Sequence, residues 1–77
     1  MPRPDPKLIV AANRAAEARR IVAGQRLLIE TLKASGRPAE DAEVTLQLYI
    51  SALEVLERHE RKLREEGRAK RRETRKK

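Results

Sequence analysis

The sequence predicts an all-α protein, a two-helix antiparallel hairpin that dimerises into a four-helix bundle and ends in a disordered basic C-terminal tail. Two segments within residues 20–63 carry apolar residues at three- and four-residue steps, which predicts helices. Between them, Gly36 and Pro38 are typical of a helix end and a helix start, with Gly36 expected as a left-handed cap. A chain of 77 residues with one internal helix–helix face buries little, so we expect self-association or a partner.

The first helix is expected from about residue 6 to residue 34, after a flexible proline-rich N-terminus over residues 1–5. Asp5 suits the N-cap position, because its carboxylate can accept from free N–H groups, and Pro6 suits the first helical position. Residues 7–23 are rich in alanine, which favours helix but buries little area per residue. This half of the helix is therefore expected either to pack closely or to fray.

From residue 21 the first helix carries a heavier stripe on one face. Its members are Ile21, Val22, Gln25, Leu28, Ile29 and Leu32. Leu27 points away from this face. Gln25, in the middle of the stripe, is the kind of polar residue that can fix register or oligomeric state. Gly24 indicates either a close backbone approach, which we favour, or a tolerated cost of about 1 kcal/mol relative to Ala.

The second helix is expected from about residue 38 to residue 66, with Gly67 as its stop and acids in its first turns at the positive end of the helix dipole. Its main stripe, interrupted by Glu60, is Ala42, Leu46, Tyr49, Leu53, Leu56 and Leu63. A second row on the adjoining flank is Val44, Leu48, Val55 and His59. With Ile50, the two rows exceed the roughly 100° stripe that one neighbouring helix covers, which predicts an antiparallel bundle of two hairpins.

Several side chains of the second helix have expected roles. The oligomer or partner interface is predicted to contain Val44, Leu48, Tyr49, Leu53, Val55 and Leu56. Tyr49, the only aromatic residue, is expected in the core with its hydroxyl at an edge. The pairs Glu54–Arg58, Glu57–Arg61 and Glu60–Arg64 at i,i+4 each contribute about 0.2–0.5 kcal/mol and extend the helix past the bundle core. His59 has no second His or Cys, so no metal site is expected.

Positive charge is concentrated in the last quarter of the chain. Residues 58–77 hold 11 Lys and Arg against 4 Glu, whereas residues 1–57 hold 8 charges of each sign, so the whole net charge of +7 belongs to residues 58–77. Residues 67–77 are predicted to form the basic tail. Its candidate polyanion-binding residues are Arg68, Lys70, Arg71, Arg72, Arg75, Lys76 and Lys77. The tail has no aromatic residue, Asn or Gln, so it predicts contacts to phosphates and no base reading.

The leading hypothesis is a small non-enzymatic helical module that binds nucleic-acid backbone through its basic tail without sequence preference. In the alternatives, the tail binds an acidic protein or only solubilises, and the apolar face of the second helix makes the chain a protein–protein adaptor or a structural subunit. The sequence has no Cys nucleophile, glycine-rich phosphate loop or zinc motif, so no catalytic residue, cofactor or small-molecule substrate is expected. Cytoplasmic location without membrane contact is expected, because no apolar run approaches bilayer length.

One resemblance covers residues 20–63. It is carried by the hinge glycine and the leucine spacing, that is Gln25, Leu28, Ile29, Leu32, Gly36, Ala42, Leu46, Leu53, Leu56 and His59. With these residues the chain resembles short uncharacterised bacterial helical-hairpin proteins of unknown function. Those proteins often have a polar Asp-Thr-like cap after the glycine, where this chain has Arg37 and Pro38. The resemblance implies a hairpin and implies no function or site residue.

Overall fold

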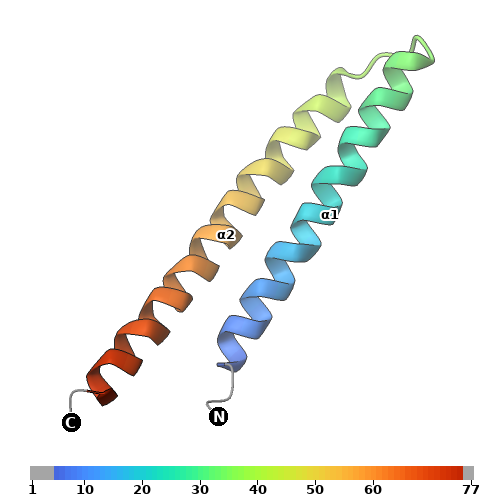
Figure 1. The fold of residues 1–77 in the computed structure, drawn as a ribbon. Helices are drawn as coiled ribbons and strands as arrows, with labels where there is room; N and C mark the ends of the chain where they lie inside the picture. Colours follow the sequence, from blue (N-terminus) through green and yellow to red (C-terminus); the bar gives the residue numbers. More distant parts are fainter. Residues whose placement is uncertain (1–4, 76–77) are drawn as a thin grey trace.

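The computed structural model describes residues 5–75, with side chains through residue 71, as two long helices lying side by side (Figure 1). Helix α1 spans Pro6–Ala34 and helix α2 spans Glu40–Arg75. They run antiparallel, so the start of α1 and the end of α2 lie at the same end of a rod measuring 65 × 19 × 14 Å (Figure 1). The predicted all-α hairpin is confirmed, and α1 has the expected bounds.

The starts of the two helices differ in how they are capped. The Asp5 carboxylate accepts from the Lys7 backbone N–H at 2.9 Å and Pro6 occupies the first turn, which confirms the predicted N-cap. Helix α2 starts at Glu40, two residues later than expected, and the Glu43 N–H donates to the Ala39 carbonyl at 2.9 Å. The first turn of α2 therefore satisfies its backbone through Ala39, which is 7% exposed.

The turn between the helices is a Schellman motif. Gly36 has a φ of 71°, the left-handed conformation expected of it. The Arg37 N–H donates to the Leu32 carbonyl at 2.8 Å, and the Gly36 N–H donates to the Lys33 carbonyl at 3.1 Å. These two bonds satisfy carbonyls that the end of α1 leaves without helical partners, so the chain reverses within five residues, 35–39.

The end of α2 differs from the prediction. The helix passes through Gly67 to Arg75, whereas the sequence was expected to end it at residue 66 and continue as a disordered tail. A glycine in a helix interior costs only about 1 kcal/mol relative to alanine, and Gly67 does not adopt a positive φ. The partly buried Leu63 and the Glu60–Arg64 ion pair hold the preceding turns in helix. Lys76, Lys77 and residues 1–4 lie outside the described residues.

The helices meet along a seam whose members alternate three- and four-residue steps, the spacing of a coiled coil. On α1 the seam consists of Leu8, Ala11, Ala15, Ala18, Val22, Gln25, Ile29 and Leu32. On α2 it consists of Ala39, Ala42, Leu46, Tyr49, Leu53, Leu56, Glu60, Leu63 and Gly67. Every member except Tyr49 is buried or partly buried. The main stripe predicted for the second helix is therefore the surface that faces α1.

The stripe predicted for the first helix is confirmed only in part. Val22 and Ile29 are each 7% exposed, but Ile21 is 42% and Leu28 47% exposed, because both lie beside the seam rather than in it. Leu27 points away as expected, with 63% of its surface exposed. The seam continues toward the start of α1 through the alanine-rich half and does not include Ile21 or Leu28.

The alanine-rich half of α1 packs closely. Ala11 is 4% exposed and Ala15 is fully buried against α2. A methyl group removes little apolar area from water, so this contact holds the helices together with a small hydrophobic gain per residue. Of the two outcomes expected for this segment, packing rather than fraying is the one observed.

Two mid-helix positions in α1 have clear outcomes. The Gln25 side-chain amide donates to the Ala42 carbonyl at 2.9 Å, so this seam residue joins the two helices and fixes their register. Within the hairpin, the close backbone approach favoured for Gly24 is wrong, because a Cβ added there meets no atom within 4 Å beyond its chain neighbours and the nearby backbone of its own helix. Gly24 is therefore a tolerated weakness of the helix.

Candidate nucleic-acid and partner interfaces

The hairpin has a thin core. Its buried apolar residues among those described are Ala11, Ala15, Val22, Ile29 and Ala39. The accessible surface is 6779 Å², whereas a compact monomer of the same mass exposes only about 4800 Å². The radius of gyration is 18.1 Å, against about 11.5 Å for a compact chain of this length. The molecule therefore leaves an unusually large surface in contact with solvent.

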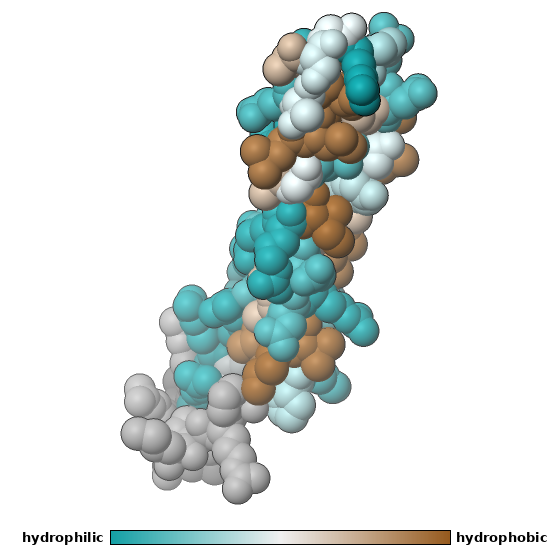
Figure 2. Space-filling view, turned by 90° about the vertical axis from the view of Figure 1, so that its right-hand side faces the viewer, coloured by the Kyte–Doolittle hydropathy of each residue, from teal (hydrophilic) through white to brown (hydrophobic). Residues whose placement is uncertain are grey.

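Exposed apolar side chains gather on one side of the seam, which we call the apolar flank. Its members, from 38% to 66% exposed, are Val10, Ile21, Leu28, Leu48, Tyr49 and Val55. They occupy positions beside seam residues on both helices, and residues three or four apart share a helix face. Figure 2 shows hydrophobic side chains gathering in patches along the rod, separated by hydrophilic ones.

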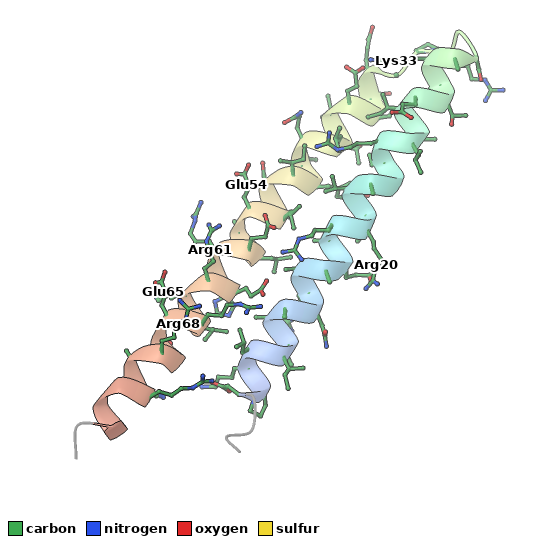
Figure 3. The ribbon with its side chains drawn as sticks, viewed as in Figure 1. Arg20, Lys33, Glu54, Arg61, Glu65 and Arg68 are labelled. Carbon is green, nitrogen blue, oxygen red and sulfur yellow. The ribbon has the colours of Figure 1, made fainter. Side chains whose placement is uncertain are left out.

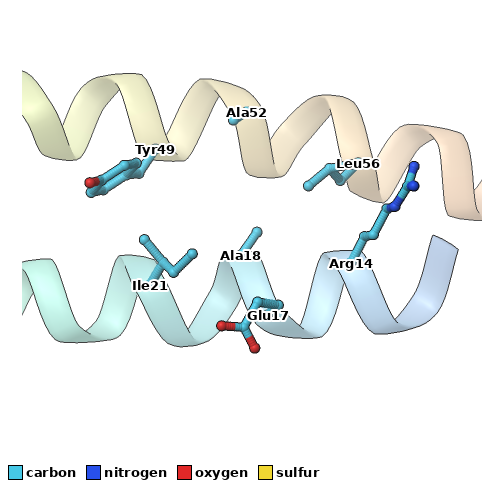
Figure 4. Close-up of a pocket in the computed structure, with 7 residues that line it drawn as sticks. All are labelled: Arg14, Glu17, Ala18, Ile21, Tyr49, Ala52 and Leu56. Atoms are coloured by element: carbon cyan, nitrogen blue, oxygen red, sulfur yellow. The ribbon is translucent and has the colours of Figure 1, made fainter. Parts of the chain in front are cut away.

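Two hollows mark the apolar flank where side chains from the two helices face each other. In the first, Ile21 of α1 points toward α2, and Tyr49 and Leu56 of α2 point toward α1 (Figure 4). The second lies nearer the start of α1 and includes Val10, His59 and Leu63 in its lining. Arg14 borders both hollows. Within the single hairpin, Tyr49 therefore lines a groove and stays 38% exposed; its predicted place in the core of a bundle stays a prediction.

The opposite side of the seam, which we call the ion-paired flank, is satisfied within the chain. An Arg19 guanidinium nitrogen lies 3.0 Å from a Glu57 carboxylate oxygen, and the Lys33 ammonium lies 3.2 Å from a Glu43 carboxylate oxygen. Both pairs join α1 to α2. Exposed pairs of this kind contribute only about 0.2–1 kcal/mol each to stability. Their main effect is to favour this register of α1 against α2 over others.

A buried carboxylate interrupts the apolar stripe of α2. Glu60 is 8% exposed and occupies a seam position. It accepts two hydrogen bonds from Arg64 one turn later, and its other oxygen lies 3.8 Å from Arg19 of α1. The predicted Glu60–Arg64 pair thus forms. Glu57, expected to pair with Arg61, reaches across to Arg19 instead.

The residues predicted for the interface divide into two groups. Val44, Leu48 and Val55 are 62%, 66% and 59% exposed, so all three remain accessible. Leu48 and Val55 lie on the apolar flank, whereas Val44, one turn before Leu48, lies on the outer side of α2. Leu53 and Leu56 are partly buried members of the seam. Tyr49 belongs to both groups, since it occupies the seam and remains 38% exposed.

The predicted polyanion-binding residues lie along the last turns of α2. Arg68, Lys70 and Arg71 are exposed there, and Figure 3 shows Arg68 near the end of α2. Arg72 and Arg75 belong to the same helix, with side chains outside the described part. Arg68 and Arg71 also border a hollow beside Asp5 at the start of α1. The structure therefore carries the basic segment as a continuation of the hairpin.

Other kinds of site are not evident in the part of the chain that the structure describes. His59 is exposed at the edge of the second hollow, and no group of three or more His, Asp or Glu residues among residues 5–71 could hold a metal ion. Within the same described residues, neither helix has an apolar stretch of the length needed to cross a bilayer.

Comparisons with known proteins add no further assignment. The chain matches no protein-family model, no curated protein and no solved structure.

Proposed function

We propose that the chain is a non-enzymatic module that pairs into a four-helix bundle through its apolar flank and binds nucleic-acid backbone through its basic helix ends. The observation that carries the binding role is the exposed set Arg68, Lys70 and Arg71 at the end of α2, where the net charge of the chain is concentrated. Cations that neutralise phosphates release counterions, and this release supplies sequence-independent affinity.

The apolar flank supports a second hairpin as its occupant. The surface in excess of a compact monomer is about 2000 Å², which is comparable to the total area of a stable protein–protein interface. Six of the nine exposed large apolar side chains lie on this flank, and the charged residue Arg14 borders both of its hollows. An apolar centre with polar residues at intervals is typical of an interface between subunits.

Charge favours an antiparallel arrangement of the two hairpins. Residues 30–43 around the turn hold four acids and two cations, whereas residues 58–77 hold the whole positive excess. A parallel dimer would bring two strongly basic ends together, and the like charges would repel each other. An antiparallel dimer places each basic end beside an acidic turn and separates the two binding ends along the rod. Two linked binding ends also raise the effective concentration for a second contact.

The pairing is tested by the light-scattering mass of the full-length chain, nuclease-treated and in high salt. Salt screens contacts between the basic end and polyanions but leaves apolar association intact, so a dimer mass is expected. A monomer mass would contradict the pairing.

The binding role is tested by deleting residues 68–77 and measuring the affinity for a nucleic-acid duplex as a function of salt. The intact chain should bind with an affinity that falls steeply with salt, and the deletion should abolish binding. Unchanged binding after the deletion would overturn the proposed role. The deletion should leave the dimer mass intact, because the apolar flank lies within residues 10–55.

The exposure of Leu48 and Val55 also favours a second candidate function, an adaptor that docks a helix of a different protein on the apolar flank. In that role the basic end acts as a solubilising segment. A folded monomer in high salt, together with no affinity for nucleic acid, would favour the adaptor over the proposed function.

A further inference from the structure

Arginines and lysines occupy different sides of α2 in its basic part. Arg61, Arg64, Arg68 and Arg71 follow steps of three, four and three, so they form one row along the helix, and all four are exposed. Lys62 and Lys70 fall outside this row. The row spans about 15 Å at the helical rise per residue, and the same spacing places the backbone of Arg75 in line with it.

Among the residues that the structure describes, the row begins just after the last ion pairs between α1 and α2, which Arg19 makes with Glu57 and Glu60. Glu57 lies one helical turn before Arg61 and is held by Arg19. Beyond that pair, α1 offers no acid to the row until Asp5, because residues 6–16 contain only two charges, Lys7 and Arg14, both positive. Within the described residues, Arg61 forms no ion pair with Glu57, and Arg64 alone of the row pairs with Glu60. Residues 6–16 of α1 therefore supply no counter-charge to the row.

We infer that the arginine row is a contact surface for the phosphodiester backbone of a nucleic-acid duplex, with Arg61 and Arg68 as its main contacts. This inference rests on the proposed function. It places the nucleic-acid contact on one face of α2, and that face includes Arg61 and Arg64, which precede the basic tail. Guanidinium groups bind phosphate oxygens through two parallel hydrogen bonds, which lysine cannot do. Arg61 and Arg68 are exposed, so their guanidinium groups are accessible.

A duplex is the ligand that fits this surface. A helical row presents one arginine at about every 5 Å, and a duplex presents a regular, rigid series of phosphates along each strand. A single strand would need aromatic side chains on which its bases stack. The only aromatic residue, Tyr49, lies in the seam at the middle of the rod, more than two turns from Arg61.

Glu65 provides an independent feature of the same surface. It projects from the outer side of α2 beside Arg61 and Arg68 (Figure 3). Its carboxylate repels phosphates that approach the row, so removing its charge should strengthen binding. Glu66, the next residue, carries the same charge on a different side of the helix and serves as its matched control.

The test measures affinity of the full-length chain for a short mixed-sequence DNA duplex across a salt titration. The double variant R61Q/R68Q should weaken binding by about tenfold or more and make the slope of log affinity against log salt shallower by about two. The control K7Q/K62Q removes the same charge from exposed positions off the row at the same end of the rod, and should weaken binding by less than about threefold. E65Q should tighten binding by more than E66Q does.

The outcomes separate the row from the broader proposal. Equal losses for R61Q/R68Q and K7Q/K62Q would rule out the row as a distinct contact surface and leave charge-driven binding intact. No loss in either double variant, together with unchanged binding on deletion of residues 68–77, would overturn both. If poly-glutamate at equal charge concentration displaced the duplex, the row would not be specific for phosphate. That result would overturn the inference and favour an acidic protein as the ligand. Circular dichroism of each variant checks that the helices remain intact.

Discussion

The two flanks of the seam differ in what their side chains already contact. On the ion-paired flank, Arg19 and Lys33 of α1 meet Glu57 and Glu43 of α2 across the hairpin. On the apolar flank, side chains such as Leu48 remain two-thirds exposed. Both flanks border the same seam of small and medium side chains. The difference teaches that side chains on the ion-paired flank find their partners within the chain. Those on the apolar flank stay available to a second hairpin.

The largest expected effect is the loss of pairing when a charge enters the apolar flank. Leu48→Glu should convert the dimer to a monomer in light scattering, because a carboxylate would be buried without a partner at the interface. Leu27→Glu is the matched control, since Leu27 is similarly exposed, at 63%, but points away from the seam. A dimer mass for Leu48→Glu, or equal loss in both variants, would remove the distinction between the flanks.

A smaller effect is expected at Glu60, where the ion-paired flank reaches into the seam. Glu60→Leu should raise the free energy of unfolding by about 1–2 kcal/mol, because a buried carboxylate is replaced by apolar packing. Arg64 and Arg19 are about half exposed and regain water when their partner is removed. Urea unfolding checks the change. A loss of stability would show that the network contributes more than apolar packing at this position.

Gly24 tests the α1 side of the hairpin. Gly24→Ala should raise the free energy of unfolding by about 1 kcal/mol, because the added methyl meets open space and alanine has the higher helix propensity. Gly36→Ala is the contrasting control and should lower stability, since its φ of 71° strains any side chain. If Gly24→Ala lowered stability or weakened the dimer, the added methyl group would clash with a second hairpin. The interface would then include the backbone of α1 at Gly24 as well as the side chains of the apolar flank.

The smallest effect is expected on the ion-paired flank. Lys33→Glu places a second carboxylate beside Glu43 and should lower the free energy of unfolding by less than about 1 kcal/mol, because both side chains are about half exposed or more. Lys33→Glu with Glu43→Lys should restore most of that loss. Light scattering should give the same mass for both variants. A monomer mass would place this flank, too, in an interface.

Local sequence signals predicted the hairpin because its ends depend on short-range chemistry. Asp5 with Pro6 and the single left-handed Gly36 each act on backbone groups within a few residues, so their positions fix α1. Gly67 shows the limit of the same reasoning. Its cost of about 1 kcal/mol is small enough for neighbouring turns to outweigh, and the helix continues.

Long-range features of the candidate sites could not be predicted in the same way. The i,i+4 spacing indicated the Glu60–Arg64 pair, but Arg19, which is distant in sequence, is what draws Glu57 across the hairpin. The seam passes through Ala11 and Ala15, whose low hydropathy signal made Ile21 and Leu28 look central. The distance between the helix axes decides which residues face the other helix, and the hydropathy of single residues does not encode that distance.

The buried Ala11 and Ala15 have one more consequence, which concerns the order in which the hairpin opens. An alanine side chain loses no rotamer entropy on burial, but it also removes little surface from water. The end of the rod that contains them is therefore held less strongly than the end closed by the turn, where Val22, Ile29 and the Schellman bonds lie. Opening begins at the start of α1 and proceeds toward the turn, so the basic part of α2 is the first to be released from its neighbour.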